Sequence, residues 1–342
     1  MPDFPYINAR VRAMRSRLLD AGQMEELLAV PTLDAFTQAL NTTPYGHEVQ
    51  EALTRYPALQ AVDAALARNF YQTTTKIRGF ADGKPRQLIE IVLMRWDLAN
   101  LRLIMRGKHT GSRGEDIAAN IIPAGSLNEA ALRELAGQPD VPAVVGALSG
   151  LNHPFVTPLQ EGMAEYLETK DLFALELPLE RFYALYGLRM AKGSGRSEQV
   201  VRSLLQAELD ATNVKTAFKL QPTALGREEK ARFFIPGGRI VSADLFVLLA
   251  DRQTAEQGVK WLRIQGFPVK TVSEDLTAFE RDLDLAIIKA QTNLYLGDPL
   301  SIDIVVAYLA LKYNEVKNLR LIARSKQLGI PRDRVRKEMV VV

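Results

Sequence analysis

A six-residue pattern, acid–x–x–Asn–apolar–basic, occurs three times in this chain of 342 residues, each time in sequence with helical periodicity. A second basic residue follows the first by one helical turn in every copy. The asparagines are separated by 113 and 105 residues, which predicts three copies of one helical unit. The pattern residues, which are our candidate structural or interface residues, are Asp97, Asn100, Arg102 and Arg106; Asp210, Asn213, Lys215 and Lys219; and Glu315, Asn318, Arg320 and Arg324.

Proline loops follow the pattern at a constant distance. A proline preceded by a β-branched residue comes 23 residues after an asparagine in three places, of which the first is a fainter copy that lacks the acid. The three pairs are Asn8 with Pro31, Asn100 with Pro123, and Asn213 with Pro236. After Asn318 an Ile330–Pro331 pair comes 13 residues later, so we expect a shortened loop there. The alternative is that helices of similar length often end in proline loops.

Helical periodicity dominates the rest of the chain. Apolar residues recur at three- and four-residue spacing in the stretches 58–72, 86–106, 199–220 and 277–295. Gly107, Gly187 and Gly329 are predicted to end helices. One stretch, 264–272, alternates like a strand but is interrupted by Pro268. The sequence therefore predicts an all-α fold, with units at approximately 1–110, 111–225 and 226–342.

The spacing within the pattern indicates what its side chains do. The acid and the asparagine are three residues apart and share a helix face, whereas the first basic residue lies on another face. Asparagine is a poor helix former, so we favour a recurring hydrogen bond to a neighbouring backbone over a contact with a partner. Each basic pair places like charges one turn apart, which costs a few tenths of a kcal/mol. Three explanations are open: the basic pairs lie on a solvated face, they contact carboxylates within the chain, or they contact an acidic partner.

Composition excludes several classes of protein. Lysine and arginine number 43 against 40 aspartates and glutamates, which argues against a dedicated nucleic-acid-binding protein. There is no cysteine, and therefore no disulfide framework and no thiol chemistry. No stretch approaches the ~20 apolar residues of a membrane span, and the N-terminus does not resemble a secretory signal. We expect a soluble, cytoplasmic protein.

Signals for catalysis are weak. The three histidines, His47, His109 and His153, have no metal-binding spacing, and we predict that all three are exposed to solvent. The segment 79–85 is similar to a phosphate-binding loop, but proline stands where the Ser or Thr that holds magnesium should be. We therefore expect no enzyme activity, no cofactor and no metal.

The two ends of the chain resemble one family. Residues 314–322, with Lys326, the segment 329–331 and the basic tail 332–337, resemble the end of the C subunits of V/A-type ATPases, a family whose eukaryotic counterpart is the vacuolar d subunit. Residues 6–12 are similar to the start of that family. The resemblance spans the whole chain. The copy at Asn213 departs most from the pattern, because it has a lysine, which cannot make the planar bidentate contact of arginine.

The resemblance implies an all-helical, funnel-shaped subunit of three similar domains. We expect the domains to surround a pseudo-threefold axis, with the helix near Asn8 approaching the helix near Asn318. The family implies a non-catalytic rotor part, monomeric within a hetero-oligomer, at the cytoplasmic face of the membrane. It would link the proteolipid ring to the D and F subunits of the central stalk and transmit torque for coupled ion transport and ATP synthesis or hydrolysis. The alternatives are a helical-repeat scaffold of another soluble complex and a helical nucleic-acid-binding protein.

Overall fold

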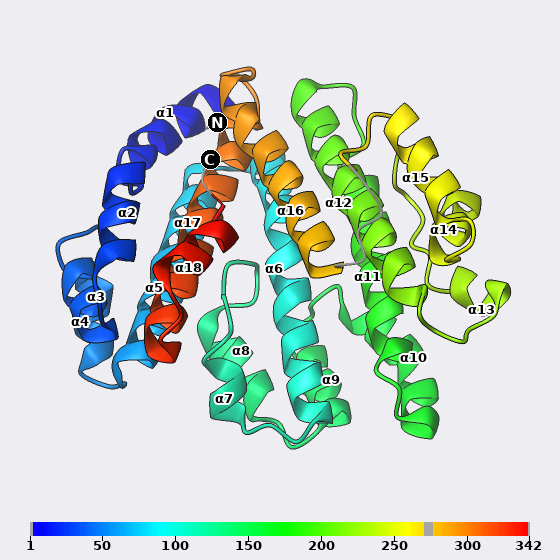
Figure 1. Cartoon of the computed structure of the whole chain (residues 1–342), viewed down its shortest axis with the longest axis horizontal. Coiled ribbons are helices and arrows are strands. Elements are labelled where there is room, and N and C mark those ends of the chain that lie inside the picture. The colour runs from blue at the N-terminus through cyan, green and yellow to red at the C-terminus, as the bar shows by residue number, and fades with distance from the viewer. Residues whose placement is uncertain (1–2, 270–275, 341–342) are drawn as a thin grey trace. The chain divides into compact units, whose positions relative to one another are not determined.

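The computed structural model describes residues 3–269 and 276–340, and these residues form α-helices and one short 3-10 helix, without a strand (Figure 1). The all-α prediction is confirmed. Residues 265–269 of the strand candidate form no strand, and its remaining residues lie outside those described. The chain forms two compact units, Met1–Val156 with Thr292–Val342, and Thr157–Gln291. The bounds of three repeated domains stay a prediction.

The first unit contains helices from both ends of the chain. Helix α17 packs against α1, α3 and α5 (Figure 1). The helix that contains Asn8 therefore adjoins the helix that contains Asn318, as expected. Residues 301–310 at the start of α17 are all buried and form the centre of this unit. The helices of the first unit are α1 (Phe4–Arg15), α2 (Ala21–Ala29), α3 (Leu33–Leu40), α4 (Gly46–Leu53), α5 (Ala58–Phe80), α6 (Gly83–His109), α7 (Gly114–Ala118), α8 (Glu129–Gly137), α9 (Val141–Ser149), η1 (Leu294–Leu296), α17 (Asp303–Leu328) and α18 (Arg332–Glu338).

The second unit is built round α12, which packs against α11 and α14. Its core includes Val214 and Phe218 of α12, Phe246 of α14 and Leu283 of α16. In Figure 1 the green and yellow helices α12, α14 and α15 belong to this unit. Its helices are α10 (Val156–Thr169), α11 (Phe173–Met190), α12 (Arg196–Leu220), α13 (Arg227–Ala231), α14 (Ala243–Ala250), α15 (Ala255–Ile264) and α16 (Leu276–Asn293), the first and last of which extend slightly beyond the unit.

Three short helices begin with the same kind of cap. The side chains of Asp20, Asn128 and Ser242 accept hydrogen bonds from the backbone N–H groups three residues later, at 2.8, 2.9 and 3.2 Å. These residues precede α2, α8 and α14, and each bond satisfies a donor that the first helical turn leaves free.

Three glycines were predicted to end helices, and one of them does. Gly329 ends α17 with a φ of 66°, a conformation that glycine adopts easily. Gly107 and Gly187 lie inside α6 and α11, so those two predictions are wrong. At Gly107 a Cβ atom would lie 2.6 Å from the side chain of Ile117, so the glycine allows a close contact with α7. Close packing explains this residue better than termination does.

Candidate functional site: three asparagine clasps

Each asparagine of the pattern binds both backbone groups of one later residue. Its Nδ2 donates to the carbonyl of the residue 22 positions later, and its Oδ1 accepts from the N–H of that same residue. All three asparagines are buried. We call each such pair an asparagine clasp. The clasps are Asn100–Ile122 (2.7 and 3.0 Å), Asn213–Ile235 (2.8 and 2.9 Å) and Asn318–Val340 (2.8 and 3.2 Å).

The clasp supplies hydrogen-bond partners to buried backbone groups. Buried backbone N–H and C=O groups need hydrogen-bond partners, and a segment outside helices and sheets has no regular ladder to supply them. A primary amide is both donor and acceptor, so one asparagine satisfies both groups of a residue at once. Aspartate or leucine at the same position would lack one or both of these functions. The clasp thus holds a non-helical segment against the long helix of its pattern.

The third clasp corrects one expectation from the sequence. Asn318 binds Val340 rather than Ile330 or Pro331, so this pair is not the counterpart of the other proline loops, although the connection that it forms between α17 and α18 is short. Helix α18 occupies the chain between Pro331 and the clasp. The fainter copy also differs, because Asn8 donates to the carbonyls of Pro299 and Ser301 at 2.7 and 2.8 Å. Asn8 therefore holds the segment just before α17 and forms no clasp.

The acid of each pattern fixes the backbone just before a capped short helix. Asp97 accepts from the N–H groups of Ser126 and Leu127 at 2.7 and 3.0 Å, immediately before α8. Asp210 accepts from Ile240 at 3.0 Å and from Val241 at 2.9 Å, immediately before α14. Both carboxylates are 1% exposed, so these charge-assisted bonds replace the water that burial removes.

Two glycines that the sequence analysis missed make room for these carboxylates. A Cβ atom at Gly125 would lie 2.2 Å from Oδ1 of Asp97, and one at Gly238 would lie 2.1 Å from Oδ1 of Asp210. Each glycine occupies the same place relative to its acid. The matching spacing was visible in the sequence, and it could have identified both residues as part of the repeated unit.

The third acid connects the two ends of the chain. Oε2 of Glu315 accepts from the N–H of Leu19 at 2.5 Å, and Leu19 immediately precedes the cap of α2. Helix α2 therefore stands to α17 as α8 stands to α6 and α14 to α12. The third copy of the pattern therefore binds the backbone before a short helix that lies near the start of the chain.

A buried polar cluster surrounds Glu315. Its Oε1 accepts from the Tyr45 hydroxyl at 2.5 Å and from Lys312 Nζ at 3.0 Å. Burial, with the adjacent negative charge of Glu315, raises the pKa of Tyr45 well above its ordinary value. Burial lowers the pKa of Lys312, although Glu315 opposes this shift. The lysine ammonium also lies 4.2 Å from the centre of the Tyr45 ring.

Carboxylates within the chain contact the basic residues of the second and third copies. Lys215 contacts Asp284 and Lys219 contacts Glu280, the latter at 2.6 Å, and both acids lie on α16. Both arginines of the third copy, Arg320 and Arg324, contact Asp63 of α5 at 3.3 and 3.5 Å. Of the explanations left open by the sequence, contact with internal carboxylates holds for these four residues. The basic pair of the first copy, Arg102 and Arg106, also has interaction partners.

One histidine lies at the first acid rather than in solvent. His153 is 7% exposed, and its Nε2 lies 3.0 Å from Ser126 Oγ and 3.6 Å from Oδ2 of Asp97. The prediction of exposure is wrong for His153 and right for His47 and His109. Residues 3–269 and 276–340 contain no cluster of three or more His, Asp or Glu side chains suited to a metal ion. None of the same residues forms a helix long and apolar enough to cross a bilayer.

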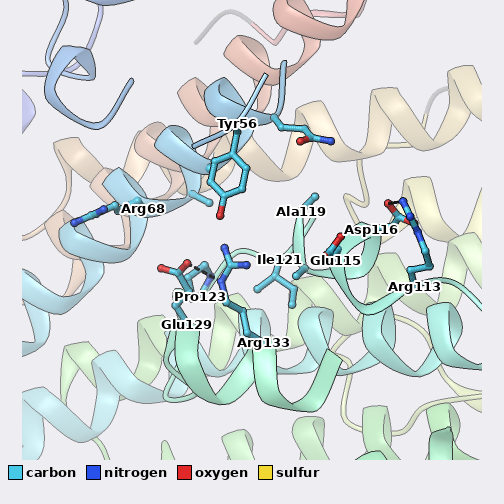
Figure 2. Close-up of a pocket in the computed structure, with 14 residues that line it drawn as sticks. Tyr56, Arg68, Arg113, Glu115, Asp116, Ala119, Ile121, Pro123, Glu129 and Arg133 are labelled. Carbon is cyan, nitrogen blue, oxygen red and sulfur yellow. Dashed lines mark hydrogen bonds and ion pairs between the residues drawn. The ribbon is translucent and has the colours of Figure 1, made fainter. Parts of the chain in front are cut away.

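A surface pocket of about 360 Å³ lies between the start of α5 and helices α7 and α8 (Figure 2). Three arginines line it, and each is paired with a carboxylate at 2.6 to 2.9 Å. The pairs are Arg68–Glu51, Arg113–Asp116 and Arg133–Glu129. Its lining contains no histidine and no serine, and two of its three carboxylates, Asp116 and Glu129, are in ion pairs with arginines. The clasps, rather than this pocket, are the distinctive feature of the molecule.

In all three copies of the pattern, a buried amide and a buried carboxylate hold backbone from another part of the chain. The family model described as ATP synthase (C/AC39) subunit matches residues 7–338, so the chain belongs to this family. Its members are non-catalytic, and the chain is therefore not an enzyme.

Three relatives match over almost the whole chain. The C subunit of the V-type ATP synthase of Thermus thermophilus is 32% identical over 340 residues, which cover 99% of this chain and 98% of the relative. The C subunit of the V-type ATP synthase of Deinococcus radiodurans is 29% identical, with 99% and 92% coverage. The C subunit of the A-type ATP synthase of Methanococcoides burtonii is 28% identical, with 99% and 94% coverage. The resemblance inferred from the two chain ends is confirmed.

Proposed function

We propose that this chain is the central-rotor subunit that links the proteolipid ring of a V/A-type ATPase to the D and F subunits of the central stalk. It sits at the cytoplasmic face of the membrane and passes torque between ring and stalk, while ATP is made or hydrolysed in other subunits. It acts as a single copy within the hetero-oligomer. The family membership and the coverage of whole relatives support this role.

The repeated clasp is the observation that carries the proposal. A part that transmits torque must resist sliding of one helix along another. Sliding at one clasp breaks two buried hydrogen bonds together with those of the neighbouring carboxylate, and unsatisfied buried groups cost about 1–3 kcal/mol each. Ion pairs from α12 to α16 and from α17 to α5 add further ties between long helices. These features favour a stiff adaptor over a flexible scaffold.

The same features support a cyclic arrangement of three units. Each copy of the pattern clasps a following segment. The acids of the first two copies fix a following short helix, whereas the acid of the third copy fixes α2, near the start of the chain. Because the third copy binds a helix from the start of the chain, we place the three copies round a pseudo-threefold axis, in a funnel-like body. We propose units with approximate bounds of 1–110, 111–225 and 226–342, with α2 completing the third.

Binding experiments test the role directly. The purified chain is mixed with detergent-solubilised proteolipid ring, with the D–F stalk, and with both. We expect a complex with each, and a ternary complex when all three are present. Failure to bind either one would refute the linking role. Capture by soluble partners alone would instead favour a scaffold of another complex.

A second experiment tests torque transmission itself. Asn318→Ala opens the third clasp but leaves the surface unchanged, and Ser203→Ala alters an exposed residue of α12 as a control. In reconstituted vesicles we expect the Asn318 variant to hydrolyse ATP while pumping fewer ions per ATP, with the control unchanged. Equal coupling in a variant shown to lack the clasp would contradict the stiffness argument.

A further inference from the structure

The segment that joins η1 to α17 carries two strongly exposed leucines. Leu296 is 88% exposed, the highest value among the large apolar side chains that the structure describes, and Leu300 is 65% exposed. Single exposed apolar residues are common on soluble proteins. Two of them four residues apart on one turn, with Pro299 also exposed between them, are less easily dismissed. We call residues 294–300 the leucine loop; it is the orange loop at the top of Figure 1, beside α1.

The leucine loop is held in place by buried and local hydrogen bonds. Asn8 of α1, which is 2% exposed, donates to the carbonyls of Pro299 and Ser301 at 2.7 and 2.8 Å. The carboxylate of Asp298 accepts from the N–H of Leu300 at 2.8 Å. At Gly297 a Cβ atom would lie 2.4 Å from Oδ1 of Asp303, so the turn is closely packed.

This rigidity favours binding. Ordering one backbone residue costs about 1–2 kcal/mol, and a loop that is already ordered avoids that cost when it meets a partner. The role of Asn8 follows from this geometry. Its amide does not clasp the Pro31 segment; it fixes the carbonyls on either side of Leu300. Asn8, the asparagine of the fainter copy of the pattern, thus holds an exposed apolar turn in place.

The charge beside the leucine loop indicates the chemistry of its partner. Helix α1 contains three arginines and no acidic residue. The guanidinium carbons of Arg12 and Arg15 lie 5.5 and 3.8 Å from the centre of the Tyr295 ring, within the loop. The one acid of the loop, Asp298, is already used by a backbone N–H. An apolar turn flanked by fixed positive charge complements an apolar surface flanked by carboxylates.

We propose that the leucine loop docks on the membrane-sector ring, inserting Leu296 and Leu300 into an apolar surface that carries carboxylates at its edge. The proposal rests on the proposed function, because it assigns to one loop the contact with the ring. The occupant is a protein surface of the ring rather than the lipid around it. Asn8 is a positioning residue, and the arginines of α1 orient the contact.

The test uses the full-length chain and a double variant, Leu296→Asp with Leu300→Asp. Leu328→Asp is the matched control, since this residue is 73% exposed at the other end of α17. Affinity is measured for the solubilised ring, for the D–F stalk, and for ring-free vesicles of anionic lipid. We expect the double variant to bind the ring about 100-fold more weakly, because full burial of one leucine corresponds to roughly tenfold or more in affinity. Stalk binding should be unchanged, and the control should bind like the unaltered chain.

A further variant, Asn8→Ala, separates position from apolar contact. It keeps both leucines but frees the loop, so we expect weaker ring binding with unchanged stalk binding and unchanged circular dichroism. Ring binding by the double variant at full strength would overturn the inference and leave the proposed function standing. Equally tight binding of the unaltered chain to ring-free vesicles, lost in the double variant, would overturn it in favour of lipid. If the unaltered chain binds neither ring nor stalk, the proposed function itself fails.

Discussion

The second clasp offers the clearest test of the structural argument. Asn213 is fully buried, and Ile235, whose N–H and C=O it binds, is 3% exposed. Asn213→Ala removes both partners. Each buried group left without a hydrogen bond costs about 1–3 kcal/mol, and water that enters the vacated space can recover part of this. We therefore expect a loss of about 2–4 kcal/mol, a large share of the ~5–15 kcal/mol by which folded proteins are stable.

Asn213→Asp adds a signature that a simple loss of packing would not show. The aspartate can still accept from the N–H of Ile235, but a charged oxygen then faces the carbonyl where the amide donated. This repulsion and burial raise the pKa of the new carboxyl above its usual ~3.9 in the folded state. As the pH falls through that raised pKa, the carboxyl is protonated and can donate to the carbonyl. The deficit of the Asp variant should shrink in acid, while that of the Ala variant should not.

Two measurements check this prediction. Urea unfolding gives the global change, expected as a midpoint lower by about 1 M for a slope of roughly 2–3 kcal/mol/M. Hydrogen exchange over residues 232–241 gives the local change, because the amide of Ile235 loses its protection. Ser203→Ala, on the exposed face of the same helix, should stay within about 0.5 kcal/mol. A deficit below about 1 kcal/mol, or the same pH response in both Asn213 variants, would refute the reasoning.

Three other predictions concern the same framework. Gly238→Ala would place a methyl group 2.1 Å from the second acid and should cost about 1–3 kcal/mol in urea unfolding, whereas Gly79→Ala, with nothing within 4 Å, should cost nothing. Asp63→Asn leaves the side chain of Arg320, which is 13% exposed, without its charge partner. It should lower the free energy of unfolding by more than Glu280→Gln does, because the partner of Glu280, Lys219, is 57% exposed. Equal losses for the two variants would contradict this prediction. Two arginines of α18 hold the pKa of Glu25 below its ordinary 4.5, so this contact stabilises the fold above that pH and weakens as the pH falls. Glu25→Gln should therefore make hydrogen exchange in α18 less sensitive to acid. An unchanged pH profile of this exchange would count against the prediction.

The sequence predicted the helices well and their ends unevenly. Long amphipathic stretches correspond to α5, α6, α12 and α16, because apolar spacing reports directly on which helix face is buried. Gly329 ended a helix as predicted, but Gly107 did not, because a neighbouring side chain packs against it. A glycine in a sequence does not reveal whether it serves a turn or a close contact. Only the position of Ile117 decided between them.

The candidate residues were found more easily than their partners. Spacing placed Asp97 and Asn100 on one helix face, and the poor helix propensity of asparagine pointed to a hydrogen bond with backbone. The identity of that backbone was not predicted, although Ile122 and Ile235 lie in the proline loops that follow Asn100 and Asn213 at a constant distance. The burial of His153 had no sequence signal, because a lone histidine in a loop is usually exposed.

The sequence by itself determined an all-helical chain, a pattern repeated three times, and membership of one family across nearly the whole length. Only the tertiary structure decided that Glu315 binds the backbone before α2, 296 residues away, and that Asn8 holds a loop instead of a clasp. The physical reason is the range of the information. Helical periodicity is set by residues three or four apart, whereas a buried carboxylate or amide binds whichever backbone group the packing of distant helices brings to it.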